Sequence, residues 1–256
     1  MPSIAELTHA LDELLRPAAW ADVAPNGVQV PGPDDIRTVV TGVSATLELL
    51  RQAADRGADL VLVHHGLFWR GQAQAIDRPL AHKLELLLGR GMTLAAYHLP
   101  LDAHLDHGNN ALLARALGAT SFAPAFPALG PEIGVVAELP GDGIPRDELP
   151  GRVAEATAPR SGPMVSFLTG PDHVRKLGIV SGAAHDELPV AAALGCDAFL
   201  TGEAAERTMG MAHDHGISFI GAGHHDTERL GVQALGELLA ARFGVVHEFV
   251  DVPNPV

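Results

Sequence analysis

Short β-branched runs alternate with stretches rich in alanine and leucine along most of this 256-residue chain. Such alternation is typical of strand, helix, strand units around a parallel sheet. We therefore predict an α/β fold with mostly parallel sheets and helices on their faces. Strands are expected at 37–44, 59–63, 92–97, 133–138, 164–169, 176–181, 197–201, 217–221 and 245–250. Helices are expected at 1–15, 46–56, 80–90, 109–118, 184–194, 203–213 and 227–243.

The two halves of the chain are similar to each other. Residues 39–66 and 178–204 each contain a predicted strand, a turn of small residues, a helix, and a second apolar strand preceded by Asp. The next stretches, 90–102 and 215–228, match more weakly, and histidines follow the strand in both. Convergent α/β patterning could produce part of this similarity. We favour a duplicated unit, so that the fold consists of two similar α/β layered units.

A stretch at 121–132 with three prolines and one glycine is the expected connector between the halves. The predicted domains are therefore residues 1–124 and residues 125–256, with the second packing back on the first to complete a shared site. A further stretch, 140–150, is expected to be a surface loop ahead of a helix.

Charge and cysteine content exclude several classes of protein. The 17 basic and 31 acidic residues give a net charge of -14, which disfavours nucleic acid and membrane partners. The single cysteine, Cys196, cannot form an intramolecular disulfide. No apolar run is long enough to span a membrane, and the amino terminus lacks the order of a signal peptide. A cytoplasmic location is expected.

Histidines and carboxylates follow four of the predicted strands. The chain has 14 histidines, and histidine is the commonest metal ligand and general base. Ligands of open α/β sheets bind beyond the carboxyl ends of the strands, so these side chains are expected to converge. They are His64 and His65 after 59–63, His98, Asp102 and His104 after 92–97, Glu203 after 197–201, and His224, His225, Asp226 and Glu228 after 217–221.

The spacing and chemistry of these residues favour a metal site. His224 and Glu228 are four apart at the start of a predicted helix, so both lie on one face. His98 and Asp102 have the same spacing, although the intervening LPL is a weaker helix signal. Imidazole and carboxylate ligands without sulfur suit zinc, iron, manganese or nickel. Because carboxylates can bridge two ions, a dinuclear centre is the preferred interpretation.

Each motif also has an ordinary structural explanation. Adjacent residues leaving a strand point in opposite directions, so only one of His64 and His65 need be a ligand. The segment HHDTE could be an ordinary helix start, where the helix dipole favours acidic residues. Asp102 could be a turn or capping residue, and Trp69 is interpreted as a core anchor rather than a pocket wall. The expected convergence of three motifs outweighs these explanations.

Five motifs together resemble a known family. HHGLFW, YHLPLDAHLDHGNN, TGEAAE, GHHDTER and the terminal VPNPV are similar in order and spacing to the GTP cyclohydrolase 1 type 2 homologues, also called NIF-three-like or YbgI-like proteins. The resemblance covers essentially the whole chain. It implies two divalent metal ions held by the HHG histidines, the HxxxD aspartate, and the first His and the Glu of GHHxTE. Those residues are His64, His65, Asp102, His224 and Glu228, with Glu228 bridging.

The resemblance also implies a homohexameric ring and a hydrolase. The family name implies that water opens the guanine ring of GTP at C8, so a nucleotide is a candidate small-molecule substrate. Glu203 and His98 are expected either to transfer protons or to orient a metal ligand. A nucleotidase or phosphodiesterase and a non-enzymatic metal-binding scaffold oligomer are the alternatives. No P-loop motif occurs, which disfavours chemistry of the ATPase kind.

Overall fold

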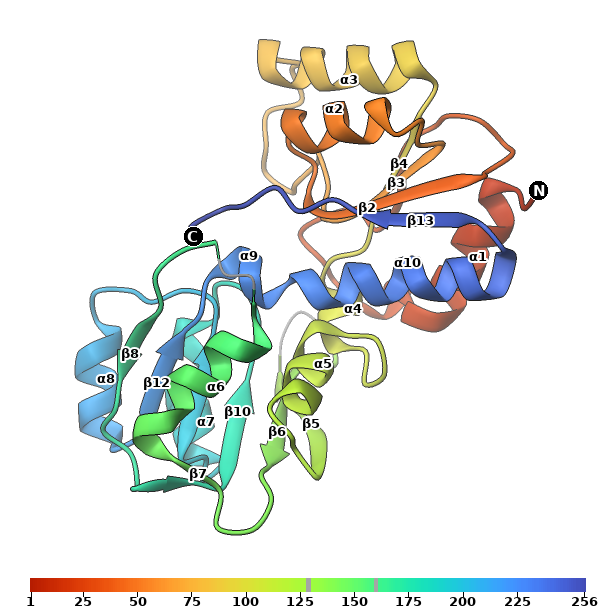
Figure 1. Ribbon diagram of the computed structural model, residues 1–256. Helices are drawn as coiled ribbons and strands as arrows, with labels where there is room; N and C mark the ends of the chain where they lie inside the picture. The colour runs from red at the N-terminus through yellow and green to blue at the C-terminus, as the bar shows by residue number, and fades with distance from the viewer. Residues whose placement is uncertain (128–129, 159–160) are drawn as a thin grey trace. The chain divides into compact units, whose positions relative to one another are not determined.

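The structure, a computed structural model, describes residues 1–127, 130–158 and 161–256 of the chain. Contacts within the chain divide these residues into two units, each with its own sheet and its own apolar core (Figure 1). The first unit comprises Met1–Leu101 and Gly231–Val252. The second comprises Asp102–Leu230 and Pro253–Val256.

The first unit is built on a five-stranded sheet with the strand order β1-β4-β3-β2-β13. Its four strands from β4 to β13 run parallel, and β1 pairs antiparallel with β4 at one edge. This sheet confirms the expected mostly parallel arrangement. The strands are β1 (Gly27–Val30), β2 (Thr38–Ser44), β3 (Leu60–His65), β4 (Thr93–Ala96) and β13 (Val246–Phe249).

Helices cover both faces of this sheet, as the uninterrupted apolar sequence of β3 requires. Successive side chains of a strand point to opposite faces. Val61 and Val63 accordingly pack with α2 and α3, whereas Leu60 and Leu62 pack with α1 and α10. Figure 1 shows α2 and α3 on one side of the sheet and α1 and α10 on the other. The helices are α1 (Ile4–Leu15), α2 (Leu47–Asp55), α3 (Arg78–Arg90) and α10 (Arg229–Phe243), with a short 3-10 turn at Pro17–Ala19.

Local sequence signals explain where these helices begin and end. Ser3 and Glu6 form a capping box at the start of α1, in which each side chain accepts a hydrogen bond from the other's backbone. Asp77 caps α3 by accepting from the backbone of Leu80, and Gly91 ends that helix with φ +65°. Among the described residues, no helix combines the length and apolar character needed to cross a membrane.

The carboxyl-terminal part of the chain returns to the first unit. β13 adds to the sheet beside β2, and Leu235 and Leu239 of α10 share an apolar cluster with α1. The sequence-based division into 1–124 and 125–256 placed α10 and β13 in the second domain. The structure places β13 and most of α10 in the first unit, because their apolar faces are buried there, and places α5 (Asn109–Ala116) in the second.

The second unit contains a six-stranded mixed sheet with the order β5-β6-β10-β11-β12-β8. Among the strand pairings that the structure describes in this sheet, β10 with β11 and β11 with β12 are parallel and the other three are antiparallel, so this sheet is not mostly parallel as predicted. The expected connector 121–132 contains strand β5, and its residues 128–129 lie outside the described residues. The strands are β5 (Ser121–Pro127), β6 (Glu132–Glu138), β8 (Val165–Phe167), β10 (Lys176–Ile179), β11 (Ala198–Thr201) and β12 (Ser218–Gly221). A separate two-stranded antiparallel sheet pairs β7 (Ile144–Pro145) with β9 (His173–Val174).

Helices also cover both faces of the second sheet. Leu200 and Ile220 pack with α5 and α6, whereas Phe199 and Phe219 pack with α7 and α8. Both units are therefore helix, sheet, helix layers, and their origin by duplication stays a prediction. The helices are α6 (Leu149–Ala156), α7 (Leu188–Ala193), α8 (Thr208–His215) and α9 (His224–Thr227), with 3-10 turns at Arg146–Glu148 and His185–Glu187. The short helix α4 (Leu99–Ala103) lies where the chain passes from the first unit to the second.

Tyr97 ties helix α1 to the end of β4. The ring is fully buried, and its hydroxyl donates a 2.7 Å hydrogen bond to Oδ1 of Asp12. Burial, together with the neighbouring Asp12, holds the pKa of Tyr97 above its usual value, so the hydroxyl remains a donor. We expect Tyr97→Phe to lower the free energy of unfolding by about 1 kcal/mol, because Asp12 loses its partner. Urea unfolding measures this change, and unchanged or increased stability would contradict it.

Candidate metal centre

Three histidines gather at the carboxyl ends of two neighbouring parallel strands in the first unit. His64 and His65 are the last residues of β3, and His98 follows β4. The ring centroids lie 4.6 Å apart for His64 and His65, 5.0 Å for His64 and His98, and 5.5 Å for His65 and His98. One ring nitrogen from each lies within 4.8 Å of the others. Both histidines of the HHG motif therefore contribute to one cluster, and neither is turned away into the core.

Hydrogen bonds fix the orientation of the HHG imidazoles. Nδ1 of the buried His64 donates to the carbonyl oxygen of Tyr97 over 2.9 Å. Because a carbonyl only accepts, Nδ1 carries the hydrogen of the neutral ring and the lone pair lies on Nε2. Nδ1 of His65 shares a 3.0 Å hydrogen bond with the hydroxyl of Ser44, at the end of the adjacent strand β2. Metal-binding histidines commonly have one nitrogen engaged in this way.

The glycine of HHG is required by a close neighbour. A Cβ at Gly66 would overlap the side-chain amide of Gln29, which comes from β1. That amide accepts a 2.7 Å hydrogen bond from the backbone of Leu67 and donates a 2.8 Å bond to the carbonyl of Pro25. Gln29 thus fixes the chain as it leaves the histidine pair. No motif in the sequence singled it out.

Trp69 forms a wall of the histidine cluster. Its ring meets His98 edge-on, with centroids 5.2 Å apart and planes at 82°. The centroid of His65 lies 5.6 Å away. The tryptophan is half-buried, so it is a wall of the cluster rather than the expected core anchor.

Asp102 is held rigidly within the second unit. Its side chain is buried, and Oδ1 accepts hydrogen bonds from Nδ2 of Asn109 at 2.8 Å and from the Ser181 hydroxyl at 2.9 Å. Asn110 supports the arrangement by donating to the Asp102 carbonyl and accepting from the backbone of Ser181. The segment around Asp102 forms the short helix α4, despite its weak helix signal. The carboxylate is therefore oriented by more than a turn or cap.

A second pair of candidate ligands lies at the other strand ends of this unit. His224 opens α9 directly after β12, and its Nε2 lies 3.2 Å from Oε1 of Glu228. Nδ1 of His224 lies 2.6 Å from Oε1 of Glu203, which follows β11. Burial by itself lowers the pKa of His224, but the two carboxylates raise it to about 9. A cation bound there would therefore replace a proton.

Gly182 leaves space beside this pair. The residue has φ +70°, and a Cβ there would lie 2.5 Å from Oε1 of Glu228 and 3.3 Å from Nε2 of His224. A separation of 3.2 Å between nitrogen and oxygen is close to that of two ligands of one first-row ion, because each ligand atom lies about 2 Å from such a metal. The donor atoms and the space beside them fit a divalent cation.

Two of the polar residues expected after strands, and one exposed arginine, have structural partners outside the candidate ligand clusters. Both carboxylate oxygens of Asp226 accept from the backbone of Ser161. Nδ1 of His104 accepts from two backbone N–H groups of its own turn. Arg207 forms an exposed ion pair with Asp186 at 2.6 Å.

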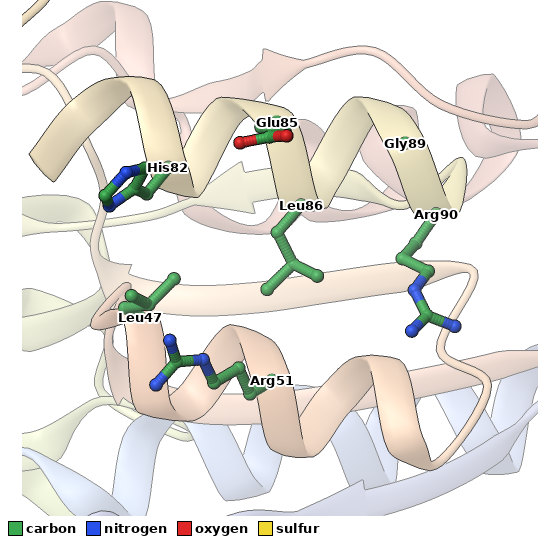
Figure 2. A pocket seen from close by; sticks show the side chains of 7 residues that line it. All are labelled: Leu47, Arg51, His82, Glu85, Leu86, Gly89 and Arg90. Atoms are coloured by element: carbon green, nitrogen blue, oxygen red, sulfur yellow. The ribbon is translucent and has the colours of Figure 1, made fainter. Parts of the chain in front are cut away.

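A groove of about 520 Å³ lies elsewhere in the first unit, between α2 and α3. Figure 2 shows charged side chains from both helices around it. Among the described residues, none of the candidate ligands lines this groove. Its ionisable members are Arg51, His82, Glu85 and Arg90.

Comparison with known proteins decides the family. The model of the Duf34/NIF3 family, in which NIF3 stands for NGG1p interacting factor 3, matches residues 2–255. The chain belongs to the Duf34/NIF3 family. A family relative from Pseudomonas aeruginosa, called GTP cyclohydrolase 1 type 2 homolog, is 40% identical over 253 residues, which cover 99% of this chain and 98% of the relative.

Solved structures of similar proteins support the Duf34/NIF3 assignment. Protein ybgI, described as of unknown function, is similar with a TM-score of 0.91 and 38% identity, covering 99% of this chain and 100% of that one. TTHA1606 from Thermus thermophilus is similar with a TM-score of 0.87 and 35% identity, covering 99% and 100%. The predicted α/β class and the family resemblance are confirmed. Several groupings of His, Asp and Glu among the described residues could bind a metal ion.

Proposed function

We propose that this protein binds two divalent metal ions through His64, His65, Asp102, His224 and Glu228 and uses them in a hydrolytic reaction. The five residues come from both units, and each unit supplies an oriented set of donor atoms. The resemblance to the family implies this ligand set, and every one of its positions is filled in this sequence.

The observation that carries the proposal is the common orientation of the imidazoles. His64, His65 and His224 each engage Nδ1, with a carbonyl, a hydroxyl and a carboxylate respectively. Such contacts select the ring orientation in which Nε2 is the donor atom toward a metal. A histidine serving only as a core residue needs no such uniform arrangement.

The two carboxylates differ in how they are supported. Asp102 is fixed by Asn109 and Ser181, which leaves it little freedom to rearrange. Glu228 lies between α9 and α10, with its Oε1 3.2 Å from Nε2 of His224, and would be the bridging ligand. We infer that Glu203 is a positioning residue for His224, because its carboxylate bonds directly to Nδ1 of that ring. This is the second of the two roles expected for Glu203.

The reaction we propose is hydrolysis of a small molecule, with ring opening of a nucleotide such as GTP as the first candidate. Divalent ions at such a site supply Lewis acidity, which activates water toward an electrophilic carbon or phosphorus. Trp69 would limit the access of bulk water, and the buried Asp102 would keep its orientation as substrate binds. The names of the relatives support the choice of GTP as the first substrate to test.

The test combines metal analysis with a substrate screen. We expect protein purified without chelator and loaded with zinc, iron, manganese or nickel to bind two equivalents of metal and to release formate from GTP. Glu228→Gln should lose the bridging ligand and lower the metal content to about one equivalent or less. Glu206→Gln, which changes an exposed carboxylate in the same unit, is the matched control and should keep both ions.

Each result of the screen has a defined meaning. Release of phosphate without formate would replace the cyclohydrolase assignment by that of a nucleotidase or phosphodiesterase. Absence of any product across a nucleotide panel, with the metals bound, would favour a metal-binding scaffold. Failure of the wild-type protein to bind metal would remove the proposal altogether.

A further inference from the structure

We propose that His98 is a metal ligand and that Asp22 is its positioning residue, so that His64, His65 and His98 form a three-imidazole site within the first unit. The site would bind one first-row divalent ion. The proposal rests on the proposed metal-binding function, because it shares His64 and His65 with it. It adds a ligand and a positioning residue that the five-residue set does not contain.

The three rings are already close to the geometry that one ion requires. Their candidate donor nitrogens all lie within 4.8 Å of one another. Two nitrogens bound tetrahedrally to one zinc ion are about 3.3 Å apart. An ion bound at this cluster would draw the nitrogens together by at most about 1.5 Å. Three nitrogen ligands leave a fourth position open, as catalytic zinc sites do.

Asp22 holds His98 through both carboxylate oxygens. Oδ1 lies 2.8 Å from Nδ1 of His98 and accepts from the backbone of Ala24 at 3.1 Å. Oδ2 accepts from Nδ2 of Asn26 at 2.9 Å and from the backbone of Leu99 at 3.1 Å. The backbone N–H of His98 also donates to Oδ1 of Asn26. The residue is therefore clamped at its ring and at its backbone by one short loop.

This clamp determines which ring nitrogen can bind a metal. The carboxylate at Nδ1 requires a hydrogen there, so the neutral ring of His98 has its lone pair on Nε2. The Asp22 side chain is only 4% exposed and that of His98 only 13%. A carboxylate, histidine and metal in series is a common arrangement in metalloproteins.

Replacing Asp22 with asparagine would disturb the hydrogen bonds that orient the His98 ring. Each carboxylate oxygen accepts two hydrogen bonds, so an amide NH₂ group would face two donors in either orientation. If that NH₂ group faced His98, the ring would have to accept at Nδ1 and carry its hydrogen on Nε2, where a metal could no longer bind. Asp22→Asn therefore tests orientation while preserving side-chain volume.

The experiment uses the full chain with two of the second unit's three proposed ligands, His224 and Glu228, replaced, while Asp102 is kept. In His224→Gln/Glu228→Gln protein, we expect one equivalent of Co²⁺ to bind, with visible absorption of a nitrogen-rich site. Pulsed electron paramagnetic resonance of one equivalent of Cu²⁺ should count three coordinated imidazoles. Adding His98→Gln should reduce the count to two, and adding Asp22→Asn should lower the Co²⁺ affinity about 10–100-fold.

Two matched controls separate ligation from folding. His82→Gln changes an exposed histidine of the same unit, seen beside the groove in Figure 2. Asp59→Asn changes a carboxylate that accepts from the backbone of Arg37 and Thr38 in the same unit. Both should leave the imidazole count and the Co²⁺ affinity unchanged. Thermal unfolding of the metal-free variants identifies any that misfold, and His98→Gln alone then decides the test.

The outcomes distinguish this proposal from the proposed function. An unchanged imidazole count in the His98 variant would overturn the three-imidazole site and leave the five-ligand proposal intact. Loss of all binding in the double variant, with two ions in wild-type protein, would have the same meaning. A single ion in both proteins, bound by three imidazoles, would support the three-imidazole site and overturn the dinuclear centre.

Discussion

Gly182→Ala is expected to lower the affinity of the protein for a divalent ion at the His224 and Glu228 pair by more than about 100-fold. The added Cβ would lie 2.5 Å from Oε1 of Glu228 and 3.3 Å from Nε2 of His224. The carboxylate must therefore move away from the imidazole. Replacing a residue that only hydrogen-bonds to a metal ligand already lowers metal affinity by about 10–100-fold. In Gly182→Ala, an atom of a proposed ligand is itself displaced. Calorimetric titration of metal-free protein with Zn²⁺ measures the loss.

Gly195→Ala is the matched control for backbone strain. Gly195 belongs to the same unit and has φ +75°, close to the +70° of Gly182, but a Cβ there would meet nothing within 4 Å among the described residues. A left-handed alanine costs about 1–2 kcal/mol at either position, so both variants should be less stable. Only Gly182→Ala should lose metal. Equal affinities in the two variants would show that the space beside Glu228 has no part in binding.

The strands and helices could be predicted from the sequence wherever the apolar pattern was continuous. The run 59–63 predicted β3, because a strand buried on both faces is apolar at every position. The two-residue strands β7 and β9 and the edge strand β1 were missed, since short or half-exposed strands have little pattern. β5 was mistaken for a connector because its prolines argue against a strand, yet prolines are tolerated at a sheet edge.

The division of the chain into units could not be read from composition. The stretch rich in proline around residue 124 looked like a boundary, but burial decides where a segment packs. Leu235 and Leu239 of α10 complete the core under α1, and β13 forms hydrogen bonds with β2. Such pairing over a long sequence separation leaves no local signal, because it depends on which unburied face and which sheet edge remain available.

Candidate ligands of the metal site could be identified from the sequence. Positions directly after buried strands identified the clustered histidines of the first unit and the pair His224 and Glu228, because strand ends converge in parallel sheets. The supporting residues were not identified. Asp22 lies in an irregular loop 76 residues before His98, and Ser181 lies 79 residues after Asp102. An isolated Asp or Ser in a loop has no spacing that marks its partner, so only the folded chain reveals these contacts.

Gly236→Ala is expected to destabilise the protein by about 2 kcal/mol, although alanine normally stabilises a helix relative to glycine by about 0.5–1 kcal/mol. Gly236 is a buried residue of α10, and a Cβ there would overlap the imidazole of His247 on β13. Nε2 of His247 forms a 2.8 Å hydrogen bond with the hydroxyl of Thr41 on β2. Moving the ring away would break this bond, so overpacking and a lost hydrogen bond oppose the helix propensity.

The sign of the change, measured by urea unfolding, decides between packing and propensity at Gly236. Gly89 is the matched control, because it lies in α3 of the same unit, and a Cβ there would meet nothing within 4 Å of the described residues (Figure 2). Gly89→Ala should therefore raise the free energy of unfolding by about 0.5–1 kcal/mol. If Gly236→Ala also raised the free energy of unfolding, the imidazole of His247 would be able to rotate away at little cost. The contact between α10 and β13 would then not constrain this glycine.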